Sequence, residues 1–175
     1  MSSLLDNVSK KILGKIGEDI PESEFTNIQN LNERIHNFPV FDIIAYKDGE
    51  VYVFSAKARK LYSANGKINS RYNILYGKTV ISRKYKKALD EFKKMGLDIN
   101  KIHYCFLLCP IEENKPCVYY WGEFTEINPL CITSNIINSG INYFGIPVSE
   151  NYLMKYKIFG KHSWEYIMEK YLLTE

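Results

Sequence analysis

The sequence lacks any long uninterrupted apolar segment. No apolar run approaches the roughly 18 residues that a membrane-spanning helix requires. Residues 1–10 also lack the charged start and long apolar core of a secretory signal peptide. We therefore expect no membrane partner and a cytoplasmic location.

Zinc-type ligand patterns are also missing. The four cysteines, Cys105, Cys109, Cys117 and Cys131, show no paired two-residue spacing, and the three histidines are dispersed. In a cytoplasmic protein such cysteines are more often buried, reduced thiols than metal ligands or disulfides. We therefore expect no dedicated zinc centre.

Acidic residues are scarce in one long segment, residues 57–94. It holds 12 Lys and Arg against two acids, a net charge of +10, whereas the rest of the chain holds 11 basic and 18 acidic residues, a net charge of −7. Such a concentration is typical of a surface that contacts nucleic-acid phosphates, and the alternative is a solvated basic surface without a ligand. We favour nucleic acid. The predicted phosphate contacts are Lys60, Arg71, Arg83, Lys84 and Lys87.

Hydrophobic residues are plentiful, at 46% of the 175 residues, which excludes a disordered chain. This length suits one domain over residues 1–175. We expect its core to span about residues 4–125, with a C-terminal extension over 126–175 that packs on it.

The most informative stretch is residues 38–60. Two apolar, β-branched and aromatic runs flank Asp48 and Gly49, a pair typical of a two-residue β-hairpin turn. With this turn Asp42 lies directly opposite Ser55 and, because side chains alternate between faces, on the same face as Lys57. Both faces are mostly apolar, so these strands are expected to be central in a sheet.

Hydrophobic periodicity predicts the elements around this hairpin. In chain order they are a helix over 4–20, a short strand within 22–37, a long loop over 61–78, a helix over 79–95, strands over 101–108 and 117–121, an irregular segment over 128–147 and a closing helix over 162–173. A strand, helix, strand order from 50 to 108 predicts a right-handed crossover to a parallel strand.

The predicted loop over 61–78 interleaves aromatic and cationic residues. Tyr62, Arg71, Tyr72 and Tyr76 suit stacking on bases or contact with phosphates. The alternative, which the sequence leaves open, is that these tyrosines simply pack on the protein surface.

The order of helix, hairpin, helix and strand over about residues 4–108 resembles the PD-(D/E)XK nuclease superfamily. The residues that carry the resemblance are Pro39 to Asp42, then Ser55, Ala56 and Lys57, and Glu18 in the first helix. It implies a restriction-endonuclease-like α/β fold, with a central mixed β-sheet and helices on both faces.

The resemblance also implies a metal-dependent endonuclease that hydrolyses DNA phosphodiester bonds. Mg²⁺ or Mn²⁺ would be held by Asp42, Glu18 and the backbone carbonyl of Ala56, since Mg²⁺ prefers oxygen ligands. The expected catalytic residues are Asp42, Glu18, Lys57, which would offset charge in the transition state, and Ser55. DNA is favoured over RNA as partner, and a homodimer is possible.

This sequence departs from the family pattern at Ser55, where the family has a second carboxylate. Either Glu18 or Asp19 compensates, or the metal binds weakly, or the fold binds nucleic acid without cutting it. Asp42 and Lys57 could instead form only an ion pair. A protein-interaction domain with a tyrosine-rich surface is a further alternative.

Overall fold

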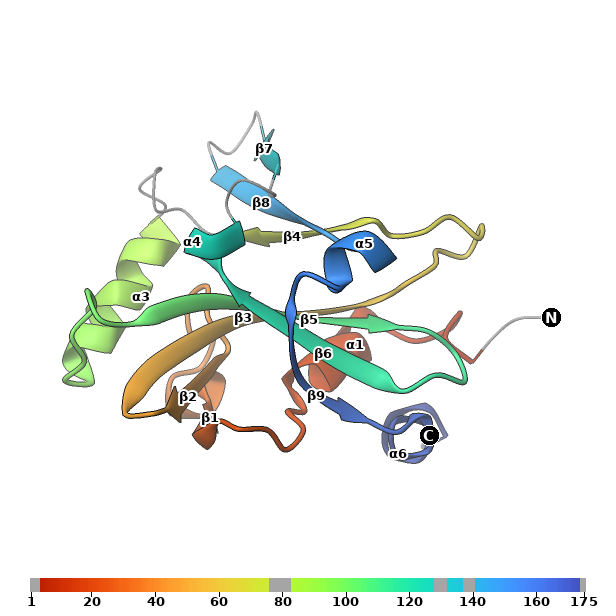
Figure 1. Cartoon of the computed structure of the whole chain (residues 1–175), viewed down its shortest axis with the longest axis horizontal. Helices are drawn as coiled ribbons and strands as arrows, with labels where there is room; N and C mark the ends of the chain where they lie inside the picture. The colour runs from red at the N-terminus through yellow and green to blue at the C-terminus, as the bar shows by residue number, and fades with distance from the viewer. Residues whose placement is uncertain (1–3, 76–82, 128–131, 137–140, 174–175) are drawn as a thin grey trace.

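The computed structural model describes residues 4–75, 83–127, 132–136 and 141–173 (Figure 1). Its elements, in chain order, are α1 (Lys10–Glu18), β1 (Thr26–Asn30), α2 (Leu31–Arg34), β2 (Ile43–Lys47), β3 (Glu50–Lys60), β4 (Arg71–Leu75), α3 (Arg83–Lys94), β5 (His103–Ile111), β6 (Cys117–Glu123), α4 (Phe124–Ile127), β7 (Ile132–Ile136), β8 (Ile141–Pro147), α5 (Glu150–Leu153), β9 (Lys157–His162), α6 (Trp164–Ile167) and the π-helical turn η2 (Met168–Leu172).

The protein is α/β, built on a mixed six-stranded sheet in the order β1-β2-β3-β5-β6-β9 (Figure 1). β3 and β5 are parallel, which confirms the predicted crossover connection, and the other neighbouring strands are antiparallel. β1 also confirms the short strand expected before the hairpin.

The predicted hairpin register is confirmed as far as Ile43 and Phe54, and the ladder ends before the predicted pair of Asp42 with Ser55. Lys47 pairs with Glu50 and Ile43 with Phe54, around the turn at Asp48 and Gly49. Both turn residues have positive φ, +52° and +77°, as a two-residue hairpin turn of this kind requires. This register fixes which side chains of β2 and β3 share a face.

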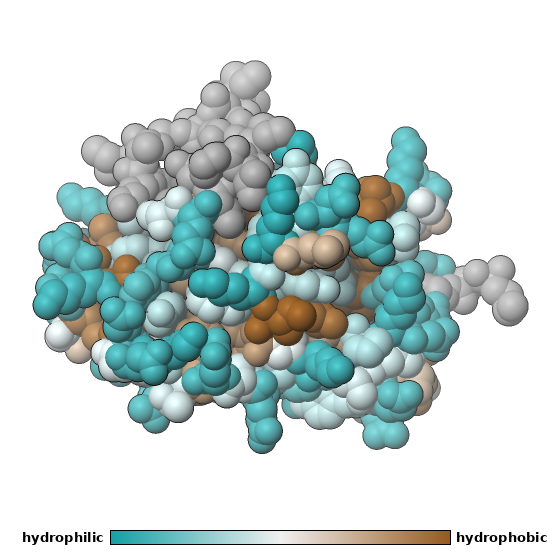
Figure 2. All heavy atoms as spheres, in the orientation of Figure 1, coloured by the Kyte–Doolittle hydropathy of each residue, from teal (hydrophilic) through white to brown (hydrophobic). Residues whose placement is uncertain are grey.

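Two apolar cores lie on opposite faces of this sheet. On one face, Tyr85, Ala88 and Phe92 of α3 pack against the sheet, and on the other, Leu13 and Ile16 of α1 do so. Helices therefore cover both faces of the sheet. Hydrophilic residues dominate the outer surface seen in Figure 2, which has a small apolar patch near its middle.

A second, three-stranded sheet was missed from the sequence. Its order is β4-β8-β7, and it lies above the main sheet in Figure 1. The predictions of a loop over 61–78 and an irregular segment over 128–147 are therefore wrong for these strands. Neither segment shows a clear apolar period, so their pairing with each other depends on contacts distant in sequence.

Other sequence predictions are confirmed with shifted ends. α1 begins at Lys10 rather than near residue 4, because Ser9 caps it by accepting a hydrogen bond from the Ile12 N–H at 3.2 Å. α3 covers the described part of the helix predicted over 79–95; residues 79–82 lie outside the described residues. The closing helix is present as α6 and η2.

The C-terminal part joins the main sheet, because β9 pairs with β6. This strand was not predicted from the sequence. Of the cysteines, Cys105, Cys109 and Cys117 are buried free thiols, and Cys131 lies outside the described residues. Among the described residues, no helix has the length and apolarity needed to cross a bilayer.

Candidate functional site

The candidate site lies where β2 and β3 separate. The last ladder pair is Ile43 with Phe54, and the Asp42 N–H still donates to the Phe54 carbonyl at 2.8 Å. Beyond it, the chain turns away at Val40, whose φ is +65°. The Asp42 carboxylate then takes the place of a backbone acceptor, and its Oδ2 accepts the Ala56 N–H at 2.8 Å.

This hydrogen bond also orients the backbone of β3. The N–H and C=O of one strand residue point to the same edge of the strand. Because the Ala56 N–H points to Asp42, the Ala56 carbonyl faces the same side, as a metal ligand at this position requires.

A pocket of about 770 Å³ opens beside Asp42. Residues from α1, α2, the following loop and α3 line it: Glu18, Asn32, His36, Asn37, Phe38, Pro39, Val40, Asp42, Lys84 and Lys87. The structure thus brings together four residues that the sequence singled out from three distant segments, namely Glu18, Asp42, Lys84 and Lys87. Two acidic and two basic residues therefore line one cavity.

The Glu18 carboxylate lies near enough to affect the Asp42 carboxyl. Burial, the largest cause, and the nearby Glu18 carboxylate together raise the pKa of Asp42 to about 6, against the opposing effects of the hydrogen bond from Ala56, the Lys57 ammonium and the Asn32 side chain. A cation bound between two such carboxylates would offset their repulsion.

Lys57 and Ser55 lie on β3 on either side of Ala56, the residue that Asp42 bonds, but they do not line the pocket. Ser55 is only 4% exposed. Lys57 is half-buried, and burial together with Arg59 lowers the pKa of its ammonium group, while Asp42 raises it. A partly desolvated ammonium next to the Asp42 carboxylate is suited to interact with a developing negative charge.

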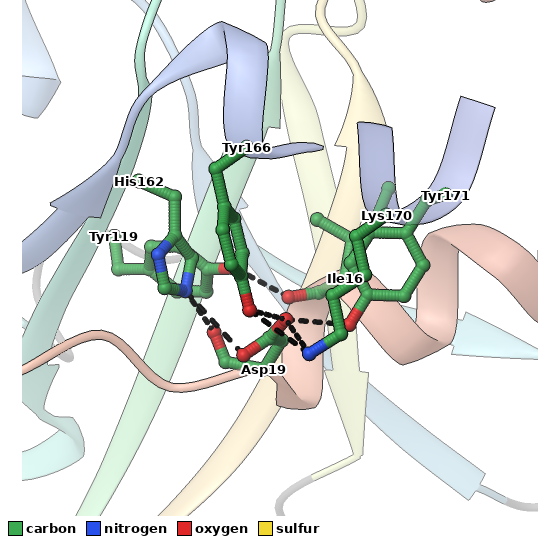
Figure 3. A network of polar contacts seen from close by, with 7 residues as sticks. All are labelled: Ile16, Asp19, Tyr119, His162, Tyr166, Lys170 and Tyr171. Carbon is green, nitrogen blue, oxygen red and sulfur yellow. Dashed lines mark hydrogen bonds and ion pairs between the residues drawn. The ribbon is translucent and has the colours of Figure 1, made fainter. Parts of the chain in front are cut away.

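The structure resolves which of the two adjacent acids at the end of α1 reaches this site. Glu18 lines the pocket, and its Oε1 accepts a hydrogen bond from Asn32 Nδ2 at 3.0 Å. Asp19 instead faces the C-terminal segment, where Figure 3 shows it surrounded by side chains of α6 and η2. Of these two acids, only Glu18 remains a candidate metal ligand.

Asp19 is bound by several donors at once. Its Oδ2 accepts from Tyr166 at 2.8 Å, Tyr171 at 2.5 Å and Lys170 at 3.1 Å (Figure 3). His162 Nε2 lies 2.7 Å from the Asp19 carbonyl oxygen. Burial raises the pKa of Asp19, but hydrogen bonds from Tyr171, Tyr166 and Lys170 outweigh it, so this pKa lies below its usual value.

The predicted phosphate contacts divide into two groups. Lys84 and Lys87 line the pocket and are exposed, and Arg83 begins the same helix, α3. Lys60 ends β3, and Arg71 begins β4 in the second sheet, so neither is part of the pocket. The basic segment therefore does not form one continuous site.

The interpretation of the tyrosines as base-stacking groups is wrong for Tyr72. It is 2% exposed, and its hydroxyl donates to the Arg59 carbonyl at 3.3 Å. Tyr62 is 46% exposed, and Tyr76 lies outside the described residues.

Asn32 and His36 line the pocket but were not predicted from the sequence. Both precede the hairpin in a polar segment without a clear period, and only the short helix α2 and its following turn bring them to the pocket. The one sequence signal is the Asn-Leu-Asn run at 30–32, in which Asn30 caps α2 by accepting the Asn32 N–H at 2.8 Å.

Among the described residues, no group of three or more His, Cys, Asp or Glu side chains is placed to hold a metal ion. Mg²⁺ requires fewer protein ligands, because it retains several waters and is commonly held by one or two carboxylates together with substrate phosphates. Glu18 and Asp42 supply two carboxylates of this kind in one pocket. The donor set therefore fits a hard divalent cation.

Comparison of the chain with protein-family models, with curated proteins and with solved structures found no match.

Proposed function

We propose that this protein is a metal-dependent nuclease of the restriction-endonuclease-like, PD-(D/E)XK type, which hydrolyses phosphodiester bonds in DNA. The observation that carries the proposal is a pocket lined by two acidic and two basic residues, Glu18, Asp42, Lys84 and Lys87. At this pocket Asp42 accepts a hydrogen bond from Ala56, the residue before Lys57. The parallel pairing of β3 with β5 and the helix α3 between them also agree with this fold.

Asp42, Glu18 and the Ala56 carbonyl would hold Mg²⁺ or Mn²⁺. A bound divalent cation polarises the phosphate and lowers the pKa of an attacking water. Lys57 would stabilise the negative charge that grows on the phosphate, and Lys84 and Lys87 would hold the neighbouring phosphates of the strand. Ser55, which is neutral and buried, would support Asp42 and Lys57 by packing.

The test is a nicking assay with supercoiled, branched and single-stranded DNA, and with RNA, in Mg²⁺ or Mn²⁺ and in EDTA. We expect nicking that EDTA abolishes. Asp42→Asn, Glu18→Gln and Lys57→Ala are each expected to slow it by about 100-fold or more, whereas Asp48→Asn, at the exposed hairpin turn, is the matched control and should leave it unchanged. Absence of nicking on every substrate would refute the catalytic proposal.

One observation favours a second candidate, a nucleic-acid-binding module that does not cut. The second acidic position of the family is occupied by a buried, neutral Ser55, and in the part of the chain that the structure describes only two carboxylates line the pocket. This candidate predicts binding that weakens steeply with salt, does not require a divalent cation, and is lost on substitution of Lys84 and Lys87.

A further inference from the structure

Asn32 contacts both carboxylates of the pocket, because its side chain interacts with Glu18 and also with Asp42, where the interaction lowers the pKa of the Asp42 carboxyl. Its Nδ2 donates to Glu18 Oε1 at 3.0 Å, and its Oδ1 accepts the Phe38 N–H at 2.9 Å. The preceding residue, Leu31, donates its N–H to the Asp42 carbonyl at 2.8 Å. The first turn of α2 therefore holds the Glu18 side chain, the Asp42 backbone and the loop at Phe38 together.

These contacts restrain the relative positions of the Glu18 and Asp42 carboxylates. Glu18 and Asp42 come from different segments, and two carboxylates beside each other repel. Without a donor on Glu18, its flexible side chain would be free to turn out of the pocket. The amide of Asn32 is itself fixed through Oδ1, so its Nδ2 points in one direction and holds the Glu18 carboxylate beside Asp42.

We propose that Asn32 is the positioning residue of this site, which acts through its contacts with Glu18 and Asp42 to hold the two carboxylates in place for a divalent cation. The inference rests on the proposed function, since it concerns the same metal site. Outer partners that orient metal ligands in this way typically contribute about 10- to 100-fold to metal affinity.

The test measures Mn²⁺ binding to the full chain by isothermal titration calorimetry. Asn32→Ala is expected to weaken Mn²⁺ binding by about 10-fold. The matched control is Asn69→Ala, which removes an amide whose Nδ2 donates to the Lys60 carbonyl at 2.6 Å, outside the pocket. It should leave Mn²⁺ affinity unchanged. Urea unfolding checks that each variant is folded.

A double-mutant cycle separates positioning from a structural role. If Asn32 positions Glu18, Asn32→Ala weakens Mn²⁺ binding less in the Glu18→Gln background than in wild type, because the part of its effect that passes through Glu18 is already lost. If the two effects simply add, the proposal is overturned. Should Asn32→Ala fail to fold, Asn32→Ser replaces it, because a short polar side chain is well tolerated in a first helical turn and does not reach Glu18.

The outcomes also distinguish the two proposals. If the wild type binds Mn²⁺ and Asp42→Asn abolishes binding, while Asn32→Ala and Asn32→Ser bind as tightly as the wild type, the inference on Asn32 fails and the metal site stands. If the wild type binds no Mn²⁺, or Asp42→Asn leaves binding unchanged, both proposals fail.

Discussion

The Asp42 carboxylate accepts the backbone N–H of Ala56 at 2.8 Å, so a charged side chain completes a hydrogen bond that the β-ladder would otherwise make. This contact holds the carboxylate at the end of the hairpin and beside the pocket that Glu18 also lines. Asp42 therefore has both a structural role and a candidate role as a metal ligand. A substitution can affect these two roles differently.

The raised pKa of Asp42 predicts a stability that depends on pH. Because the folded protein binds this proton more tightly than the unfolded chain, stability falls as pH rises from about 4 through about 6. Asp42→Asn carries no charge and keeps an acceptor for the Ala56 N–H. The free energy of unfolding of Asp42→Asn relative to that of wild type should therefore rise by about 2 kcal/mol between pH 4 and pH 7, as measured by urea unfolding. Parallel stability curves would contradict the prediction.

The same carboxylate predicts how Mg²⁺ affects stability. A cation that binds only the folded protein stabilises it, and wild type should become more stable with increasing Mg²⁺ at pH 7. Asp42→Asn should respond much less. The measurement is the midpoint of thermal unfolding with and without Mg²⁺, with Na⁺ at equal ionic strength as the control. An equal response of both proteins would argue against a metal site at Asp42.

Lys84 and Lys87 are predicted to contact nucleic-acid phosphates. The double variant Lys84→Gln/Lys87→Gln should bind DNA more weakly, and the slope of log affinity against log salt should fall by about 2, because two phosphate contacts are lost. Lys86→Gln/Lys93→Gln changes the net charge equally on the same helix but outside the pocket. Equal losses in the two double variants would show that only net charge matters. Fluorescence anisotropy over a salt series makes the comparison.

Asp19 is predicted to matter for stability rather than for metal binding. Asp19→Asn weakens the acceptor shared by Tyr166, Tyr171 and Lys170 and should cost about 2 kcal/mol at pH 7. Because the pKa of Asp19 is lowered on folding, its contribution is present above the unfolded pKa near 3.8 and is lost as pH falls below it. The gap between variant and wild type should therefore narrow in acid. Unchanged Mn²⁺ affinity is the second expectation.

Replacing two glycines by alanine is predicted to change the stability of the protein in opposite directions. A Cβ at Gly160 would lie 2.7 Å from the Glu22 carbonyl oxygen and 2.9 Å from Pro21 Cγ, so Gly160→Ala should destabilise by about 1–3 kcal/mol. A Cβ at Gly14 meets no atom within 4 Å in the middle of α1, so Gly14→Ala should stabilise by about 0.5–1 kcal/mol. Urea unfolding of both variants tests the pair, and a stability change of the same sign in both would contradict it.

The sequence predicted the centre of the fold because local signals there agree. Asp48 and Gly49 determine the turn, apolar runs determine the strands, and the register follows from both. Strict alternation of side chains would place Phe41 on the face of Ile43, but Phe41 packs with Ile44 on the other face. β2 begins only at Ile43, so the alternation of faces ends there.

The sequence could not predict the second sheet or the Asn32 contact. β4 pairs with β8 across about 70 residues, and neither strand has a distinctive apolar period. Likewise, Asn32 joins α2 to Glu18 at the end of α1, and the Leu31 N–H joins α2 to the Asp42 carbonyl just before β2. Contacts of this kind depend on how elements meet and leave no local pattern.

By itself, therefore, the sequence determined the hairpin, its register and the identity of Asp42 and Lys57 as its polar residues, because turn chemistry and side-chain alternation are local properties of the chain. Tertiary structure alone decided that Glu18 faces the pocket while its neighbour Asp19 binds the C-terminal segment. Adjacent residues at the end of a helix point in different directions, and only the elements packed around them determine which partner each one meets.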